Sequence, residues 1–169
     1  MGASTDMTRR YGWSERGVRL VEAVPAGHWK TTTLMQAVGL GGVRAAMLTD
    51  GPTNRMVFNG FVRWLLAPSL REGDIVLLDN LSSHKSPAAM EAIAAVGAEV
   101  WFLPPYSPDL NPIEKIFSKV KGLLRRAKAR STAALYEATA HALRKVTPEE
   151  CRNCFRHCGY TATSKMKML

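Results

Sequence analysis

The sequence lacks the long apolar runs and the N-terminal leader that mark membrane and secreted proteins. No apolar stretch approaches the roughly 20 residues that a bilayer span requires. The N-terminal segment "MGASTDMTRRYGW" has no apolar h-region of the kind found in signal peptides. A G-x-S-x-G turn is also missing, which argues against a serine hydrolase. We therefore expect a soluble, cytoplasmic protein without a membrane partner.

Cysteine is scarce, and all three cysteines fall in "CRNCFRHC", residues 151–158. An odd number in one short segment excludes a secreted disulfide framework. Cys151, Cys154, His157 and Cys158 are residue types that bind zinc. However, Cys151, Cys154, Phe155 and Cys158 also follow the spacing of one helix face, and free cysteine packs as a small hydrophobe. We favour the packing interpretation.

Acidic residues are few relative to basic ones, which gives a net charge of +9 from 23 Lys+Arg and 14 Asp+Glu. The excess is concentrated in residues 85–169, where 14 basic and 7 acidic residues leave +7. Such a balance is typical of proteins that bind nucleic acid, although some soluble proteins are simply basic. We expect any DNA-binding surface to lie mainly in this second half.

The chain has no internal repeat or low-complexity linker, and its 169 residues with 46% hydrophobic content suit one domain. We assign residues 1–160 to this domain and 161–169 to a frayed C-terminal tail. Strands are predicted at residues 17–25, 30–40 and 43–51, the last two joined as a hairpin by glycines. Helical spacing of apolar residues follows, and it stops near Pro68.

The most regular part of the sequence is a strand–helix–strand unit. The short apolar run "DIVLLDN" is typical of a strand covered on both faces. Ser86, Pro87 and Gly97 then mark the start and end of a helix, and "AEVWFLPP" is a second short apolar run, which we read as a strand. The two strands should be parallel, with a right-handed crossover. The domain is therefore of the α/β class.

A proline-rich loop, "PPYSPDLNP", leads into a helix with Asn111 as its N-cap and Glu114 in its first turn. Two more helices are predicted to start at Ser131 and Thr147. Functional groups in open α/β sheets collect at the carboxyl ends of parallel strands. Asp79 ends the first parallel strand, and the loop after the second delivers Glu114 to the same edge.

Two carboxylates at one edge of a sheet, in a basic protein, favour a divalent-metal site, because Mg²⁺ prefers hard oxygen ligands. Two such ions can clamp the attacking and leaving oxygens of a phosphoryl displacement. Each residue also has a plainer interpretation. Asp79 alone could be a strand-end turn residue, and Glu114 alone could be a capping-box acid.

The segments around Asp79 and Glu114 resemble motifs of a known protein family. "LLDNLSSHK", an interval of 34 residues between Asp79 and Glu114, and "LPPYSPDLNPIEKIFSKVK" resemble the catalytic domain of DDE transposases. The nearest group is the bacterial insertion-sequence transposases related to mariner. "HWKTTTLMQAVGL", "DGPTN" and "TPEECRNCFRHCGY" are similar to that group as well. The resemblance covers essentially the whole chain.

The resemblance implies an RNase H-like fold, with a mixed sheet flanked by helices, and Mg²⁺ or Mn²⁺ as cofactor, two ions in a complete site. It also implies DNA transposition: cleavage of DNA at transposon ends and transfer of the freed strand into a target. Asp79 is then the second catalytic aspartate and Glu114 the closing glutamate, both as metal ligands. Paired ends imply a homodimer.

The first of the family's three carboxylates is missing from this sequence. In the family it lies on the central strand, just before a segment resembling "GASTDMTRRYG", so most of that strand is absent as well. Other aspartates are poor substitutes by position: Asp6, Asp50, Asp74 and Asp109. We expect the isolated chain to be incomplete, with the first aspartate supplied by an upstream region or a second polypeptide. The alternative is an inactive remnant that serves only as a DNA-binding or interaction module.

A row of basic residues follows Glu114 without an intervening acid. Its members are predicted to contact DNA phosphates, the alternative being a solvated face opposite the apolar stripe. They are Lys115, Lys119, Lys121, Arg125, Arg126, Lys128 and Arg130, the first five being the DNA-binding residues we assign. Asn80 and His84 are candidates for supporting Asp79, although His84 could equally serve only to bond its own loop.

Overall fold

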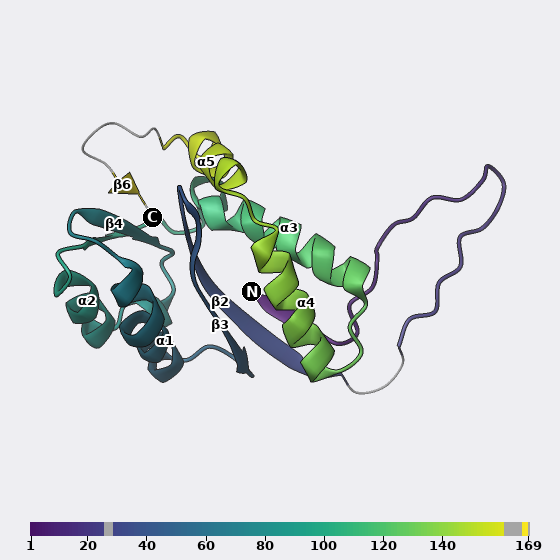
Figure 1. Cartoon of the computed structure of the whole chain (residues 1–169), viewed down its shortest axis with the longest axis horizontal. Helices are drawn as coiled ribbons and strands as arrows, with labels where there is room; N and C mark the ends of the chain where they lie inside the picture. Colours follow the sequence, from purple (N-terminus) through teal and green to yellow (C-terminus); the bar gives the residue numbers. More distant parts are fainter. Residues whose placement is uncertain (26–28, 161–166, 169) are drawn as a thin grey trace.

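The computed structural model describes residues 1–25, 29–160 and 167–168. Its strands form two three-stranded sheets, ordered β1-β2-β3 and β5-β4-β6. The strands are β1 (Gly2–Ser4), β2 (Thr31–Gly39), β3 (Gly42–Asp50), β4 (Asp74–Leu78), β5 (Glu99–Phe102) and β6 (Lys167–Met168). The α-helices are α1 (Arg55–Phe61), α2 (Pro87–Ala94), α3 (Pro112–Ala127), α4 (Thr132–Arg144) and α5 (Pro148–His157). Figure 1 shows the β2–β3 hairpin in the middle, with α1 and α2 on one side and α3, α4 and α5 on the other.

The central hairpin and the parallel unit form as predicted. β2 and β3 pair antiparallel, and the turn between Gly39 and Gly42 relies on a positive φ of 115° at Gly42. β4 and β5 are parallel neighbours connected through α2. The turn at Gly97 has φ 74°, and a Cβ there would lie 2.9 Å from Cγ of Glu72. The predicted helix near Pro68 is α1, which continues as the π-helical turn Val62–Leu66.

Alternation along β2 and β4 distributes their side chains between two cores. Leu34 and Val38 join the core formed with α3, α4 and α5, while Met35 joins the core formed with α1 and α2. β4 follows the same rule, because Val76 faces the α1–α2 core and Leu77 packs against the other. Each fully buried aliphatic side chain contributes about 1.5–3 kcal/mol. This alternation makes β4 a central element with two covered faces, as the sequence predicts.

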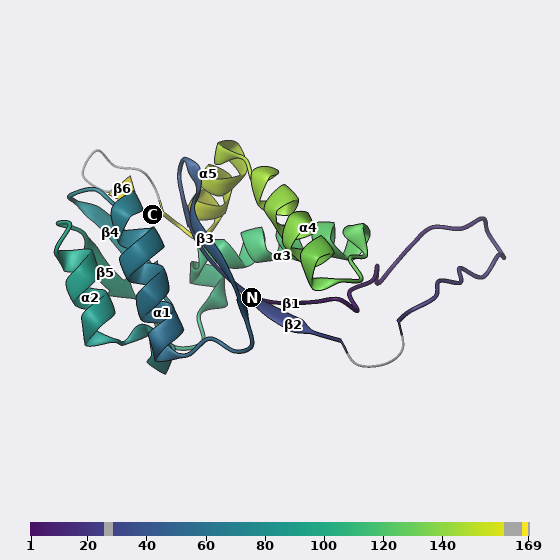
Figure 2. The ribbon, with the colours of Figure 1, turned by 60° about the horizontal axis from the view of Figure 1, so that its bottom comes forward.

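One prediction requires correction, and another falls mostly outside the described residues. The strand predicted at residues 17–25 does not form: the segment belongs to an extended arm between β1 and β2 that projects from the domain (Figure 2). Its apolar side chains find no neighbouring strand, and Val21 is 81% exposed. The C-terminal tail, predicted to be frayed, lies mostly outside the described residues. Lys167–Met168 form β6, which pairs parallel with β4 at Asp74 and Ile75.

Candidate metal and DNA site

Asp79 follows the last residue of β4 and is half-buried at the carboxyl end of the parallel sheet. Its Oδ1 accepts a hydrogen bond from the backbone N–H of Leu81, at 3.3 Å. This bond turns the chain into the 3-10 turn Ser82–His84. The strand therefore ends on an acid because the sheet edge is where a side chain leaves the two cores and meets solvent.

His84 supports Asp79 directly. Its Nδ1 lies 2.5 Å from Oδ1 of Asp79. The two atoms are in close polar contact. The contact with His84 lowers the pKa of Asp79, although partial burial opposes the shift. The other face of the imidazole packs on Phe58, with ring centroids 4.5 Å apart. These contacts keep Asp79 ionised and orient it.

Glu114 lies in the first turn of α3, where Asn111 caps the helix by accepting from the N–H of Ile113 at 3.4 Å. Among the described residues its carboxylate makes no hydrogen bond and is exposed. A capping box, by contrast, is present at α5, where Glu150 and Thr147 bond reciprocally. Glu114 is thus not occupied as a capping acid, and its carboxylate is available to a ligand.

Two cavities meet at these carboxylates. One, of about 480 Å³, lies between β2 and β4, and the other, of about 490 Å³, opens toward the proline-rich loop. Asp79 and Glu114 line both cavities, and they are the acids that do so in the part of the chain that the structure describes. The aspartates that the sequence offered as substitutes lie elsewhere: Asp6, Asp50, Asp74 and Asp109. The topology therefore brings together the two acids that the sequence singled out.

The Met1 ammonium lies close enough to Asp79 and Glu114 for their charges to affect its pKa. Its nitrogen donates to the Leu34 carbonyl at 2.8 Å, which extends the β1–β2 ladder to the wall of the first cavity. Burial lowers its pKa, as does the charge of Lys121, whereas Glu114 and Asp79 act in the opposite direction. The two carboxylates, this amine and Lys121 therefore share one electrostatic neighbourhood.

Oxygen donors for a divalent cation are present but few. Asn80 lines the second cavity, and its Oδ1 is buried without a hydrogen-bond partner in the described part of the chain. Together with Asp79 and Glu114 it offers hard oxygen atoms of the kind that Mg²⁺ and Mn²⁺ prefer. Across residues 1–25, 29–160 and 167–168, no group of three or more His, Cys, Asp or Glu side chains is placed to hold a metal ion. The residues present fit part of a ligand set.

The predicted basic row divides between two faces of α3. Lys121 and Arg125 lie seven and eleven positions after Glu114, which places them on the same helix face as that acid. Lys115, Lys119 and Arg126 form a second face. On that face, Lys119 Nζ contacts both carboxylate oxygens of Glu150 at 2.5 Å.

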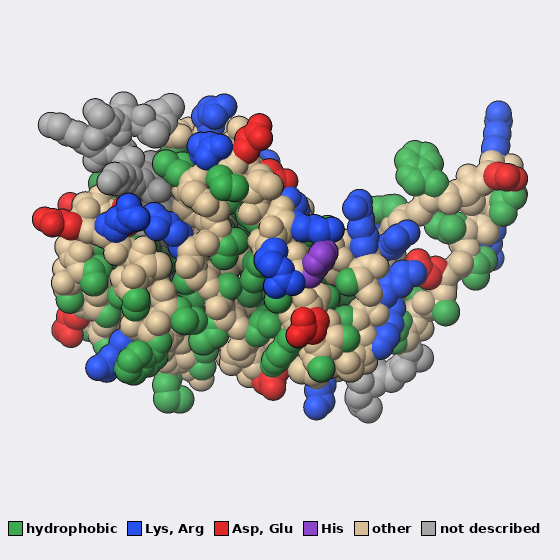
Figure 3. Space-filling view, viewed as in Figure 1, with side chains coloured by type: hydrophobic (Ala, Val, Ile, Leu, Met, Phe, Trp, Pro, Cys, Tyr) green, Lys and Arg blue, Asp and Glu red, His purple; other side chains and the backbone are tan. Residues whose placement is uncertain are grey.

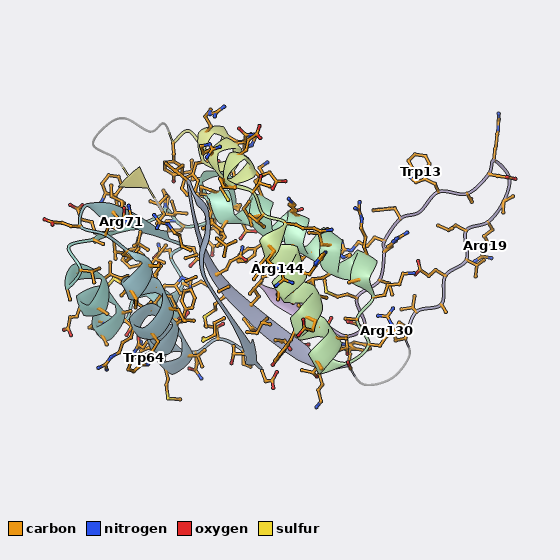
Figure 4. The ribbon with its side chains drawn as sticks, viewed as in Figure 1. Trp13, Arg19, Trp64, Arg71, Arg130 and Arg144 are labelled. Carbon is orange, nitrogen blue, oxygen red and sulfur yellow. The ribbon has the colours of Figure 1, made fainter. Side chains whose placement is uncertain are left out.

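The last two members of the row hold the N-terminal arm. Lys128 forms an ion pair with Glu22. Arg130 donates to the carbonyl oxygens of Thr5 and Met7, both at 3.0 Å. Figure 4 places Arg130 where the arm leaves the body, while Trp13 and Arg19 lie far out along it. Figure 3 shows Lys and Arg side chains gathered around this junction. Helical spacing alone could have separated the two faces, but not these tertiary contacts.

The cysteine segment forms part of the core, as predicted. Cys151 and Cys158 are buried, and Cys151 and Phe155 belong to the core formed with α3 and α4, against which Cys154 packs. Burial raises the pKa of Cys151 to about 11 and shifts those of Cys154 and Cys158 in the same direction. These thiols are therefore protonated packing groups near neutral pH.

Residues 1–136 match the DDE superfamily endonuclease family. The chain belongs to this family. A search of curated protein sequences finds no match. Within the described residues, no helix of this DDE endonuclease domain is long and apolar enough to cross a membrane.

Solved structures of Mos1 transposase share the fold. The Mos1 paired-end complex with left transposon end superposes with a TM-score of 0.58 at 22% identity, over 94% of this chain and 54% of that one. The Mos1 catalytic domain with raltegravir and Mg gives 0.55 at 19% identity, over 79% and 78%. The chain thus has the RNase H-like fold of that catalytic domain, and it spans about half the length of the Mos1 chains in the complexes.

Proposed function

We propose that this domain performs DNA transposition as a DDE transposase of the mariner-related insertion-sequence group of bacteria. In this proposal it cleaves DNA at transposon ends and transfers the strand into a target, and it acts as a homodimer on paired ends. The observation that carries the proposal is the convergence of Asp79 and Glu114 on shared cavities in a DDE endonuclease domain. Mos1 structures with a transposon end and with Mg or Mn are consistent with DNA and divalent metal as ligands.

The carboxylates of Asp79 and Glu114 and the side-chain Oδ1 of Asn80 would hold the metal. Bound Mg²⁺ or Mn²⁺ supplies Lewis-acid activation of a phosphodiester and of the attacking oxygen. The chain's own residues prepare for it. His84 keeps Asp79 ionised and fixed, the rigid start of α3 presents Glu114, and Lys121 adds positive charge for a DNA phosphate.

The proposal requires a third carboxylate, and the cavity of about 480 Å³ between β2 and β4 is consistent with an extended segment that supplies it. On the side where β1 pairs, residues 35–38 of β2 have no strand neighbour in the described chain. Opposite them, the edge of β4 that does not pair with β5 has a described strand partner only at Asp74 and Ile75, where β6 pairs. Gln36 lines this cavity with both side-chain polar atoms buried and without a partner. An upstream region or a second polypeptide entering here would end beside Asp79.

A second candidate function is supported by the small number of acidic side chains available to bind a metal ion at the site. With two acids at the site, the chain alone fits a DNA-binding or interaction module that does not cleave. Both proposed functions predict little Mg²⁺-dependent nicking of plasmid by the isolated 169-residue chain, because it lacks the third carboxylate. Strong nicking that is abolished by Asp79→Asn would show instead that the chain is complete without further ligands.

The decisive experiment begins with the DNA immediately 5′ of the Met1 codon, read in all three frames. An apolar strand ending in Asp-Glu would be joined to the chain and the extended protein tested on transposon-end DNA with Mg²⁺ or Mn²⁺. We expect strand cleavage that is lost in Asp79→Asn and Glu114→Gln and retained in Asp109→Asn. Asp109 is a matched control because it lines neither cavity. A folded extended protein that binds DNA without cleaving it would favour the module.

A further inference from the structure

Tyr106 has an unusual backbone for its residue type. Within the described chain, it and Lys128 are the non-glycine residues with positive φ, at 57° and 50°. Lys128 is the left-handed C-cap of α3, a common helix ending. Tyr106 ends no helix, and its Cβ is crowded by the following carbonyl in this conformation. Such an outlier persists only where the surrounding structure imposes it, and it points to a functional constraint.

The side chain of Tyr106 contributes nothing to the fold that would offset this strain. It is fully exposed, at 102% of its reference accessibility. The backbone on both sides is held instead. Leu103 donates to the Leu78 carbonyl at 2.8 Å, which anchors the loop to β4. On the far side, the Tyr160 hydroxyl donates to the Leu110 carbonyl, also at 2.8 Å. Prolines at 104, 105 and 108 stiffen the span between these anchors.

The loop places Tyr106 at the rim of the candidate site. Tyr106 lines the cavity of about 490 Å³ together with Asp79, Glu114 and Lys85. The Lys85 ammonium lies 6.0 Å from the ring centroid of Phe102, which is itself 41% exposed. An exposed aromatic side chain and a lysine that line one cavity have the composition of a nucleobase-stacking platform.

We propose that Tyr106 stacks on an unpaired nucleobase of the DNA strand whose phosphate lies at Asp79 and Glu114, while Lys85 contacts the backbone. The role rests on the proposed function, since it assumes that this cavity receives DNA. Stacking requires an accessible ring face and tolerates any base, so it positions the strand without reading its sequence. The rigid loop then holds the ring ready before DNA arrives, which lowers the entropic cost of binding.

The test uses the 169-residue chain and a single-stranded oligonucleotide that carries 2-aminopurine at successive positions. Stacking quenches 2-aminopurine fluorescence, so quenching at one position should be lost in Tyr106→Ala and kept in Tyr106→Phe and Tyr106→Trp. Affinity of the alanine variant should fall by about 5- to 140-fold, the usual range for removing an aromatic ring that stacks on a base. Tyr11→Ala is the matched control, because Tyr11 is also exposed (89%) but lines neither cavity.

Tyr106→Asn separates stacking from folding. Asparagine tolerates a left-handed backbone better than tyrosine, so this variant should be at least as stable while losing the quenching. Equal quenching and affinity in wild type, Tyr106→Ala and Tyr106→Asn would overturn the inference and leave the proposed function standing. Failure of cleavage by the extended protein, with Tyr106-dependent quenching intact, would overturn the proposed function alone. A wild-type chain that binds no single-stranded DNA overturns this inference, whereas the proposed function is tested on the extended protein.

Discussion

The division of α3 into two basic faces gives a quantitative prediction for DNA binding. Lys121 and Arg125 share the face of Glu114, whereas Lys115 and Arg126 lie on the face that carries the Lys119–Glu150 pair. If DNA follows the candidate site, the first pair contacts phosphates and the second does not. We therefore compare the double variant Lys121→Gln/Arg125→Gln with Lys115→Gln/Arg126→Gln, which removes the same charge.

The expected magnitude follows from counterion release. Each phosphate contact on duplex DNA contributes about −0.9 to the slope of log K against log salt. Loss of two contacts should therefore flatten the slope by about 1.8, which amounts to roughly a 12-fold change in relative affinity between 50 and 200 mM salt. The Lys115/Arg126 variant should keep the wild-type slope, because its charges point away from the site.

Fluorescence anisotropy with a labelled duplex, repeated over a series of salt concentrations, measures both slopes. Thermal unfolding of each variant checks that the fold is intact. An equal flattening by both double variants would show that α3 attracts DNA only through its total charge. An unchanged slope in the Lys121/Arg125 variant would refute the assignment of this face to DNA.

Three further predictions concern stability and reactivity. His84→Ala should remove a stabilisation that is present above the ordinary pKa of an aspartate, about 3.9, and is lost as pH falls through the lowered pKa of Asp79. Because the Asp79 side chain is 43% exposed, the free energy of unfolding of the variant should differ from that of wild type by less than ~1 kcal/mol. Denaturant unfolding at pH 3–6 measures this difference, and a difference that does not change with pH would contradict the prediction. Gly97→Ala should lower the free energy of unfolding by about 1–2 kcal/mol because φ is 74° and the new Cβ would crowd Glu72, so an unchanged denaturation midpoint would count against this turn. Cys151 should react very slowly with a thiol reagent at pH 8, since a pKa of about 11 leaves roughly 0.1% thiolate, and rapid labelling of the folded protein would contradict its burial.

Local signals in the sequence were sufficient for much of the fold. The glycines of the β2–β3 turn and the Thr147 box act through a few neighbouring residues, and each appears where it was predicted. The apolar run of β4 likewise requires only that both faces be covered. Asp79 and Glu114 could be paired from topology, because a parallel unit returns its second strand to the same edge.

The misses are features that depend on distant parts of the chain. Residues 17–25 have strand-like composition, but a strand needs a partner, and this segment finds none in the described structure. The Lys119 contact with Glu150 joins two helices and has no local signature. Tyr106 was hidden for another reason. Its loop was recognised as irregular from the prolines, but the sign of φ at one residue is set by how both ends of the loop are anchored.

The space between β2 and β4, where no described strand pairs, lies next to the candidate site at Asp79 and Glu114. β2 and β4 alternate their side chains into the same two cores, so an extended segment between them would be covered on both faces as β4 is. Gln36 and the cavity of about 480 Å³ lie along that path, and the path ends at Asp79. A segment that completes the hydrogen bonding of β2 would therefore also place its last side chain beside the catalytic candidates. If the proposed segment is joined to the chain, we expect the stability of the domain and its metal-dependent activity to rise together.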